Sequence, residues 1–259
     1  MAVTLAGGCR VSEMREGVPM AKDTLRIWNQ IGKTTGAEAI SLRVMEFASG
    51  LSPAIRNVDC DEILYVLGDG FDNEASAINL LIDNVEHCIS GDSGVYIRPQ
   101  QTFAIDNPNA NPVLIISSRC PDPVGHIEFV ERVAASSPPG NSNPPPFVRL
   151  WDRAPETTAD RWYRVLVDKE IGSTQVTQFV GSIPPGRAPD HFHQYEEVLF
   201  ILKGEGRMWA GQTNTPITAG SCIYLPKGQV HCVENTGAGE LRLLGVFYPA
   251  GSPSVRYDV

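Results

Sequence analysis

Three of the five histidines in this chain lie within one short stretch, and a glutamate lies among them. They are His191, His193 and His231, with Glu197 between the second and the third. Side chains two residues apart in a strand share a face and lie about 7 Å apart, so His191 and His193 can reach one ion. Glu197 begins the apolar run 198–202, which predicts a buried strand, and a carboxylate there is costly unless a cation pairs with it. Three neutral imidazoles and one carboxylate suit a borderline transition metal.

A structural role is the alternative for each of these residues. A lone histidine on an apolar face is usually a hydrogen-bonded core residue, and His-x-His also occurs on exposed strands. Here a glutamate, a glycine and a second block around His231 follow the pair, so the joint pattern favours a site. Glu196 and Cys232 adjoin the candidate ligands but alternate to the opposite face, which excludes them. His87 and His126 have no partners at ligand spacing and are predicted to be structural.

The arrangement resembles the two sequence motifs of the cupin superfamily. The first motif places a glycine before His-x-His and then a glutamate and a second glycine, and this chain matches it at Gly186, His191, His193, Glu197 and Gly204. The second joins a glycine, Pro-x-Gly, a histidine and an asparagine, and it matches at Gly220, Pro226, Gly228, His231 and Asn235. The resemblance covers about residues 160–250 and implies a small antiparallel jelly-roll barrel with a metal inside. By this resemblance the metal ligands would be His191, His193, Glu197 and His231.

The first half of the chain repeats the pattern of the second half. Residues 61–67 parallel residues 196–202, and residues 96–107 parallel residues 224–235 without a gap. Short apolar runs separated by turns independently favour an all-β protein. We therefore expect two tandem antiparallel jelly-roll barrels, a bicupin. The expected parts are an N-terminal barrel in residues 1–130, a Pro-rich linker or crossover in residues 131–150, and a metal-binding C-terminal barrel in residues 151–259.

The N-terminal barrel departs from the motif at the ligand positions. Arg56 and Val58 stand opposite His191 and His193, or Ile55 and Asn57 do if the register slips by one residue. The other two positions, opposite His231 and Glu197, carry Phe103 and Glu62. One carboxylate without imidazoles is not a transition-metal site, so this barrel is predicted to hold no metal and to cover strand edges. The alternatives are that Arg56 forms a buried ion pair with Glu62 or binds a small anion.

A four-ligand site inside a barrel leaves coordination positions open if the ion is octahedral, as a catalytic metal requires. We expect one divalent transition metal per chain, which could be Fe, Mn, Ni, Co or Zn because the ligand set does not choose among them. The first hypothesis is a dioxygenase-type oxidoreductase acting on a small oxygenated organic molecule chelated to the metal. The alternatives are a metal-dependent isomerase or decarboxylase, and a non-catalytic small-molecule-binding protein.

Glu197 is the expected catalytic residue, because it could carry a proton when it loosens from the metal. Proximity to the motifs suggests further residues for the substrate pocket, with Arg187 as an anchor for a carboxylate. These pocket candidates are Gln178, Arg187, Tyr195 and Met208.

Composition restricts the partners and the compartment. The net charge of −9 argues against nucleic acid and anionic membrane surfaces as partners. No apolar stretch is long enough for a membrane span, and the first residues lack the pattern of a signal peptide. Six cysteines without a C-x-x-C pair are expected to be reduced thiols of a cytoplasmic protein. The family resemblance implies a homodimer.

Two short segments, 22–31 and 155–164, are candidates for helices.

Overall fold

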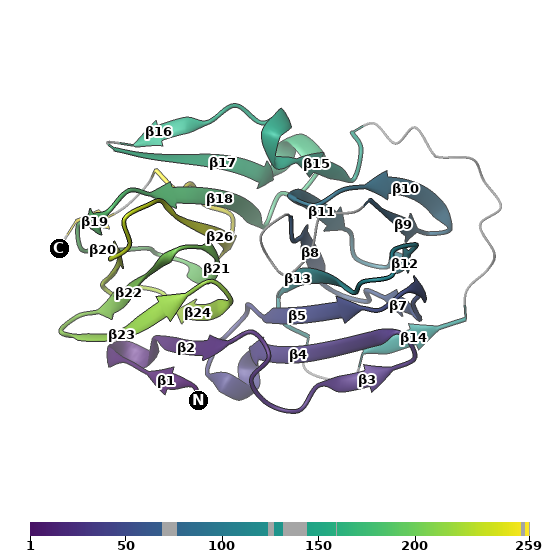
Figure 1. The fold of residues 1–259 in the computed structure, drawn as a ribbon, viewed down its shortest axis with the longest axis horizontal. Helices are drawn as coiled ribbons and strands as arrows, with labels where there is room; N and C mark the ends of the chain where they lie inside the picture. The colour runs from purple at the N-terminus through teal and green to yellow at the C-terminus, as the bar shows by residue number, and fades with distance from the viewer. Residues whose placement is uncertain (69–76, 124–126, 132–143, 159, 255–256, 259) are drawn as a thin grey trace.

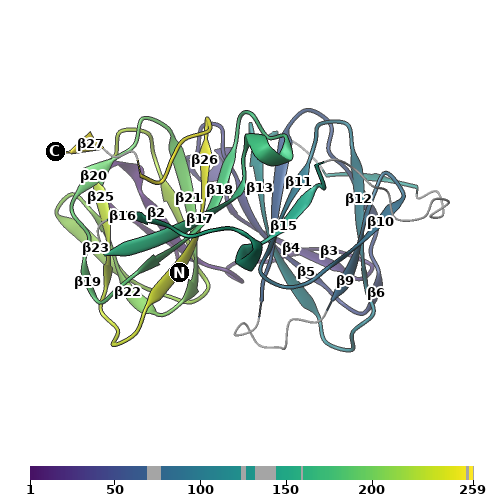
Figure 2. The ribbon, with the colours of Figure 1, turned by 90° about the horizontal axis from the view of Figure 1, so that it is seen from above.

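The computed structural model describes residues 1–68, 77–123, 127–131, 144–158, 160–254 and 257–258. Within these residues, antiparallel strands form four sheets, and the sheets make two barrels that lie side by side (Figure 1). The view from above separates the same two groups of strands (Figure 2). The predicted all-β architecture is confirmed.

Two sheets form the first barrel. The larger runs in the order β15 (Phe147–Arg149), β11 (Ser93–Ile97), β8 (Asp61–Val66), β13 (Val113–Cys120), β5 (Leu42–Phe47), β4 (Leu25–Ile31) and β3 (Met20–Lys22). The smaller runs in the order β10 (Val85–Ile89), β9 (Ile78–Ile82), β12 (Thr102–Asn107), β7 (Ala54–Arg56) and β14 (Glu128–Val130), and β6 (Gly50–Leu51) also pairs with β12.

The second barrel repeats this arrangement. Its larger sheet runs in the order β1 (Val3–Thr4), β2 (Arg10–Glu13), β24 (Ser221–Leu225), β21 (Glu196–Lys203), β26 (Leu241–Tyr248), β18 (Thr177–Ile183), β17 (Arg161–Val167) and β16 (Glu156–Thr158). Its smaller sheet runs in the order β23 (Thr213–Thr218), β22 (Glu205–Ala210), β25 (His231–Asn235), β20 (His191–Phe192) and β27 (Tyr257–Asp258), with β19 (Gly186–Arg187) also paired to β25.

The helices of the described residues are short 3-10 turns. They are η1 (Ala6–Gly8), η2 (Lys33–Thr35), η3 (Leu150–Asp152) and η4 (Lys169–Ile171). The two segments suggested as helices, 22–31 and 155–164, are wrong predictions, because strands β4, β16 and β17 lie in them. No helix of the described residues is long and apolar enough to cross a membrane.

The strand pairing crosses the domain limits expected from the sequence. Residues 3–13 belong to the first half of the chain, yet β2 pairs with β24 and so extends the sheet of the second barrel. In Figure 1 these purple strands lie beneath the second barrel. Conversely, β15 follows the Pro-rich segment but pairs with β11 of the first barrel. Most of that segment, residues 132–143, lies outside the described residues, and the limits themselves stay a prediction.

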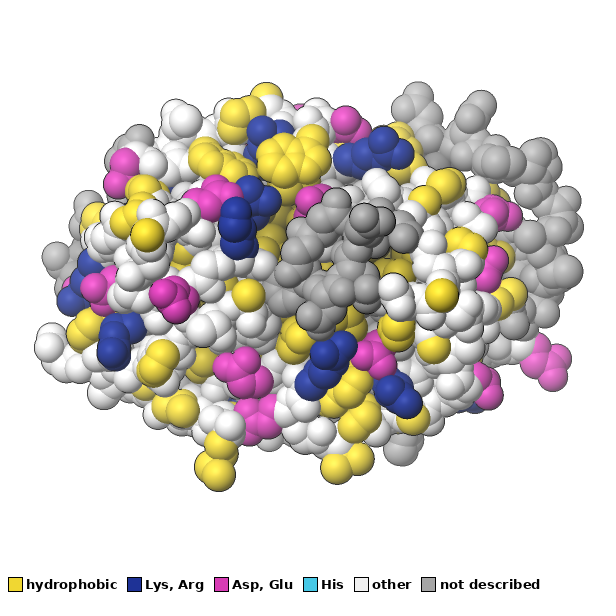
Figure 3. Space-filling model, in the orientation of Figure 1, with side chains coloured by type: hydrophobic (Ala, Val, Ile, Leu, Met, Phe, Trp, Pro, Cys, Tyr) yellow, Lys and Arg dark blue, Asp and Glu magenta, His cyan; other side chains and the backbone are white. Residues whose placement is uncertain are grey.

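Three apolar clusters explain why both faces of the large sheets are hydrophobic. One cluster fills each barrel, and the third joins the outer faces of the two large sheets. Strand β21 alternates between them: Leu199 points into its own barrel, whereas Val198 and Phe200 point into the cluster between the barrels. Burial on both faces produces a continuous apolar run instead of an alternating one. On the outer face seen in Figure 3, acidic and basic side chains are interspersed.

The buried carboxylate of Glu196, next to the candidate ligands, forms hydrogen bonds between the two barrels. Glu196 accepts hydrogen bonds from the backbone N–H groups of Glu38 (2.8 Å) and Ala39 (2.7 Å) and from the Tyr224 hydroxyl (2.5 Å). Its side chain therefore faces the first barrel, as the alternation of strand side chains predicts. Because three donors hold this carboxylate, the start of β21 is held in register, and the following residue, Glu197, is directed into the second barrel.

Candidate metal centre

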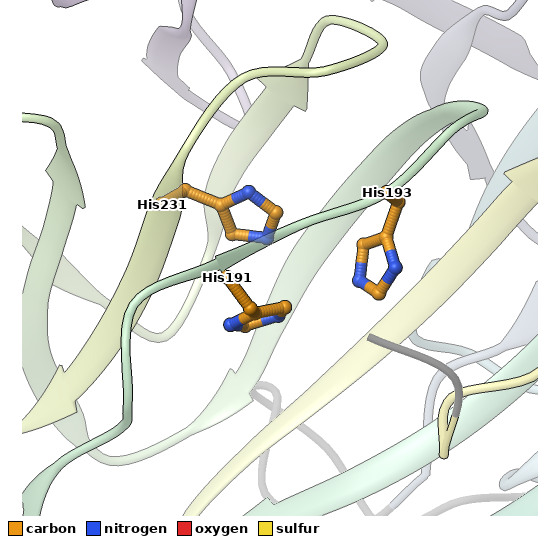
Figure 4. Close-up of side chains that lie close together, drawn as sticks. All are labelled: His191, His193 and His231. Atoms are coloured by element: carbon orange, nitrogen blue, oxygen red, sulfur yellow. The ribbon is translucent and has the colours of Figure 1, made fainter. Parts of the chain in front are cut away.

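The three clustered histidines converge in the second barrel. His191 lies on β20, His193 follows that strand, and His231 begins β25, where it is the direct register partner of His191. One ring nitrogen of each histidine lies within 4.8 Å of the others, a separation at which imidazoles could share one ion. Figure 4 shows the three rings facing a common space from two separate chain segments. Of the two remaining histidines, His87 lies on β10 of the first barrel, and His126 lies outside the described residues.

A turn glycine places the histidines relative to one another. Gly228 has a φ of 77°, a left-handed conformation that favours glycine. Its N–H donates to the carbonyl oxygen of His193 at 2.8 Å. The turn that precedes His231 is thereby attached to the segment that carries His193, so the backbone holds both rings at the same end of the barrel.

Backbone carbonyls orient two of the rings. The Nδ1 of His231 lies 2.8 Å from the carbonyl oxygen of Gln229, and the Nδ1 of His191 lies 3.0 Å from that of Pro189. Because a carbonyl can only accept, each of these Nδ1 atoms carries a proton, and in the neutral ring the lone pair is then on Nε2. This second contact of a ligating histidine is typical of metal sites, where it fixes the tautomer and the ring direction.

Glu197 completes the cluster. Its Oε2 atom lies 3.7 Å from Nε2 of His193 and 3.6 Å from Nε2 of His231, and within the described chain it accepts no hydrogen bond. Burial raises the pKa of Glu197 to about 8. Burial, followed by the nearby charge of His191, lowers the pKa of His231 to about 3. A buried carboxylate oxygen that accepts no hydrogen bond within the described residues, beside three imidazoles, fits a divalent cation, which would compensate the cost of its charge.

Metal binding is therefore expected to release close to one proton per ion at about pH 7. Glu197 has a pKa above 7 in the metal-free chain and must ionise to act as a ligand, whereas His231 is already neutral. The release should fall toward zero above about pH 9, where Glu197 is ionised beforehand. Titration calorimetry in buffers of different ionisation enthalpy measures it. A release that is unchanged between these pH values, or unchanged in Glu197→Gln, would show that Glu197 does not supply the proton.

The histidines and Glu197 form the floor of a cavity of about 130 Å³. Its wall is mainly apolar and includes Phe179, Leu199, Val233, Leu243 and Phe247. Arg161, from β17, also lines it. The Nε of Arg161 is buried and donates no hydrogen bond within the described chain, and it lies 3.5 Å from a carboxylate oxygen of Asp160. The cavity thus combines a group of candidate metal ligands, a dry wall and one guanidinium.

The four residues suggested for the pocket are not among the described residues that line this cavity. Gln178 donates to the carbonyl oxygen of Leu64 in the first barrel, because it points to the outer side of its strand. Met208 is fully buried in the core beside the cavity. Alternation along a strand directs every second side chain away from the site, so proximity in sequence to the motifs does not by itself bring a residue to the cavity.

The other two suggested pocket residues lie behind or outside the cluster. Tyr195 stacks on the ring of His193, with centroids 5.0 Å apart and planes at 11°, so it supports a candidate ligand from behind. Arg187 lies on the outer surface over the ring of Trp209 and donates to Asp190 at 3.0 Å.

The arginine that does reach the cavity is Arg161, which the sequence did not single out. It lies well before Gly186, the residue at which the first motif begins, and it carries no spacing signal. Antiparallel pairing of β17 with β18 alone brings it to the cavity.

The first barrel has no imidazole at the corresponding place. Ile55 pairs with Phe103 as His191 pairs with His231, so the register shifted by one residue applies and Asn57 corresponds to His193. Glu62 is buried and accepts hydrogen bonds from Arg43 and from the Ser117 hydroxyl. Arg56, in contrast, is exposed and lies 3.9 Å from Glu128. The suggested Arg56–Glu62 pair is therefore wrong, because Arg43 takes that role.

Comparison with known proteins places this site in a wider context. A family model described as the cupin domain matches residues 179–247. The chain is 34% identical over 83 residues to auxin-binding protein 1 of Arabidopsis thaliana, a match that spans 28% of this chain and 42% of that protein. It is 38% identical over 84 residues to an oxalate-binding protein of Thermotoga maritima, spanning 31% of this chain and 69% of that protein.

Solved structures share the two-barrel fold at low sequence identity. A deletion mutant of Bacillus subtilis oxalate decarboxylase aligns with a TM-score of 0.73 and 13% identity, covering 92% of this chain and 76% of that chain. A putative glyoxylate-induced protein from Pseudomonas aeruginosa aligns with a TM-score of 0.72 and 16% identity, covering 97% of this chain and 93% of that chain. At this identity the likeness concerns the fold, and it bears out two jelly-roll barrels in tandem.

Proposed function

Because this chain belongs to the cupin superfamily, we propose that it is a metal-dependent enzyme acting on a small carboxylic acid. One observation carries the proposal. Three imidazoles and a buried carboxylate line a mainly apolar cavity, together with a guanidinium whose Nε donates no hydrogen bond within the described residues. Such a cavity can hold a molecule that has an acidic group at one end and a metal-binding oxygen at the other.

The residues have separate roles in this proposal. His191, His193, His231 and Glu197 would hold a divalent transition metal, which would act as a Lewis acid on a bound carboxylate or carbonyl oxygen. Arg161 would anchor a carboxylate, since a guanidinium forms charge-assisted hydrogen bonds with it. The apolar wall would exclude water and strengthen both interactions. Glu197 is the residue placed to hold or release a proton at its Oε2 atom.

Decarboxylation is the reaction class that we propose first. It is supported by the relatives, since an oxalate-binding protein matches in sequence and an oxalate decarboxylase shares the fold. Dioxygenase chemistry is the second candidate. It is favoured by the aromatic and aliphatic wall of Phe179, Leu243 and Phe247, which suits a substrate with an apolar body better than it suits a bare dicarboxylate. Both candidates use the same metal centre and the same arginine.

Turnover by the metal-loaded chain distinguishes these candidates. Oxalate, short 2-oxo acids, 1,3-dicarbonyls and catechols would be supplied with and without dioxygen, while carbon dioxide release and oxygen uptake are measured. Carbon dioxide without stoichiometric oxygen uptake supports decarboxylation, and one oxygen consumed per substrate supports dioxygenation. Tight binding of such a ligand, with no turnover for any of the candidate metals, would instead indicate a non-catalytic binding protein.

The anchoring role of Arg161 has its own test. Arg161→Gln is expected to raise KM by about 10- to 100-fold, because a charge-assisted hydrogen bond contributes about 1.5–3 kcal/mol. Arg187→Gln is the matched control, since Arg187 lies on the outer surface and should leave KM unchanged. Equal KM values for the two variants would show that Arg161 does not anchor the substrate.

A further inference from the structure

The first barrel contains a cavity at the place that the candidate metal centre has in the second barrel. Its volume is about 120 Å³. It is lined by Ile55, Asn57 and Glu62, which correspond to His191, His193 and Glu197. None of the described residues that line this cavity is a histidine, so they do not form a transition-metal site, yet the cavity has not been filled by larger side chains.

Two arginines replace two phenylalanines in the wall of this cavity. Arg43 pairs with Ser117 in the first barrel. At the equivalent place in the second barrel Phe179 pairs with Gly245, so Arg43 corresponds to Phe179. Arg119 pairs with Glu62, as Phe247 pairs with Glu197 in the second barrel, so Arg119 corresponds to Phe247. Phe179 and Phe247 form part of the apolar wall beside the candidate metal centre, whereas Arg43 and Arg119 both line the cavity of the first barrel.

The guanidinium of Arg43 is buried and incompletely bonded. Only 1% of its side chain is exposed. Its Nε and Nη2 donate to the Ser117 hydroxyl, and Nη2 also donates to Glu62. Its Nη1 donates to no acceptor within the described chain. Buried guanidinium donors are almost always hydrogen-bonded, so this one, beside a cavity, indicates an acceptor that the described residues do not supply.

Arg119 presents a second donor to the same cavity. Its Nε is buried and donates no hydrogen bond within the part of the chain that the structure describes, and its Nη2 lies 3.5 Å from Asp122. Burial lowers the pKa of Arg43, and the positive charge of Arg119 lowers it further. An anion between the two guanidinium groups would relieve this repulsion and satisfy both orphaned donors.

We propose that the first barrel binds a small carboxylate anion between Arg43 and Arg119. The planar fork of a guanidinium matches the two oxygens of a carboxylate. A volume of about 120 Å³ has room for a ligand of the size of formate, acetate or a similar short acid. Glu62 and Asp122 pair with Nη2 of Arg43 and Nη2 of Arg119, so the ligand would bind through the other donors, Nη1 of Arg43 and Nε of Arg119, which these carboxylates do not use.

Further charged side chains line this cavity, and unlike the guanidinium of Arg43 they are exposed to solvent. Arg56 and Glu128 line it and lie 3.9 Å apart, with 42% and 46% of their side chains exposed, and Asp59 is also exposed there. Water and salt screen these charges, whereas the two interior guanidinium groups are shielded from both. Affinity for the anion is therefore assigned to the interior arginines, and Arg56 provides a matched control on the rim.

Calorimetric titration of the full chain with sodium acetate tests this site. The reference is His193→Ala combined with Arg161→Gln, freed of metal with a chelator and dialysed, so that acetate can bind neither to a metal nor to Arg161 in the second barrel. It is expected to bind one acetate per chain. Adding Arg119→Gln should weaken the affinity by about 10- to 100-fold, as expected for the loss of a charge-assisted hydrogen bond. Adding Arg56→Gln instead should leave the affinity unchanged.

Three results would overturn the proposal: no acetate binding by the reference, equal affinity after Arg119→Gln, or an equal loss after Arg56→Gln. The paired variant Arg43→Met with Glu62→Gln gives a second measurement, because it removes the Arg43 charge without leaving Glu62 unpaired. It should abolish acetate binding, and retained binding would also overturn the proposal. If the paired variant does not fold, Arg119→Gln alone decides the result.

Discussion

Replacing His231 by alanine is expected to abolish metal binding while the chain remains folded. His231 is the register partner of His191, and its Nε2 lies 3.6 Å from Glu197, so its loss removes one ligand from the centre of the cluster. Changes to residues that only support metal ligands typically cost about 10- to 100-fold in affinity, so the loss of a ligand itself should exceed that range. Metal content after dialysis against a defined metal buffer measures the effect.

The matched control for this prediction is His87→Ala. His87 lies on β10 of the first barrel, far from the cluster in the strand order, and should leave one metal ion per chain. Circular dichroism of both variants should retain the β-sheet spectrum, because the strands that carry His191 and His231 are paired along their backbones. Full metal content in His231→Ala would refute its role as a ligand. Two ions per chain in the unmodified protein would refute the assignment of a single metal centre.

Replacing Arg43 by methionine is expected to destabilise the first barrel by about 3–5 kcal/mol. Arg43 and Glu62 are each 1% exposed and pair directly, with the Ser117 hydroxyl at 2.7 Å completing the network. Removing the guanidinium leaves the Glu62 carboxylate buried without a counter-charge. The loss of one partner of a buried pair lowers the free energy of unfolding more than the loss of both. The midpoint of urea unfolding, followed by fluorescence and by circular dichroism, measures the loss.

Two further variants separate charge burial from other effects of this substitution. Arg43→Met combined with Glu62→Gln should recover most of the lost stability, because no unpaired charge remains. Arg26→Met is the control for a pair on the surface: Arg26 lies 3.1 Å from Glu46, but 62% of its side chain is exposed. It should cost only about 0–1 kcal/mol. If Arg43→Met is as mild as Arg26→Met, the buried pair does not stabilise the barrel.

Local sequence was sufficient to predict the all-β fold, the repeat and the histidine cluster. The two-residue period of a strand places His191 and His193 together, and the Pro-x-Gly turn positions His231 at the same end of the barrel. The same period correctly directed Glu196 away from the cluster. These features depend on neighbouring residues and on turns, so spacing along the chain carries the information.

Other features depend on segments that are distant in sequence and meet only in the folded chain. Arg161 reaches the cavity through the pairing of β17 with β18, and Arg43 reaches Glu62 across the first barrel. The pairing of β2 with β24 likewise joins residues about 200 positions apart. No local sequence pattern predicts these long-range contacts, because any of several strands could pair with a given strand.

By itself, the sequence determined which residues form a metal-binding pattern and in which half of the chain they lie. The tertiary structure decided what surrounds them: an apolar wall with Arg161 beside the histidines, and a buried pair of Arg43 with Glu62 in the sister barrel. The physical reason is that ligand spacing is a property of single strands and turns. The wall of a barrel, in contrast, is assembled from many strands whose register is established by long-range packing and hydrogen bonding.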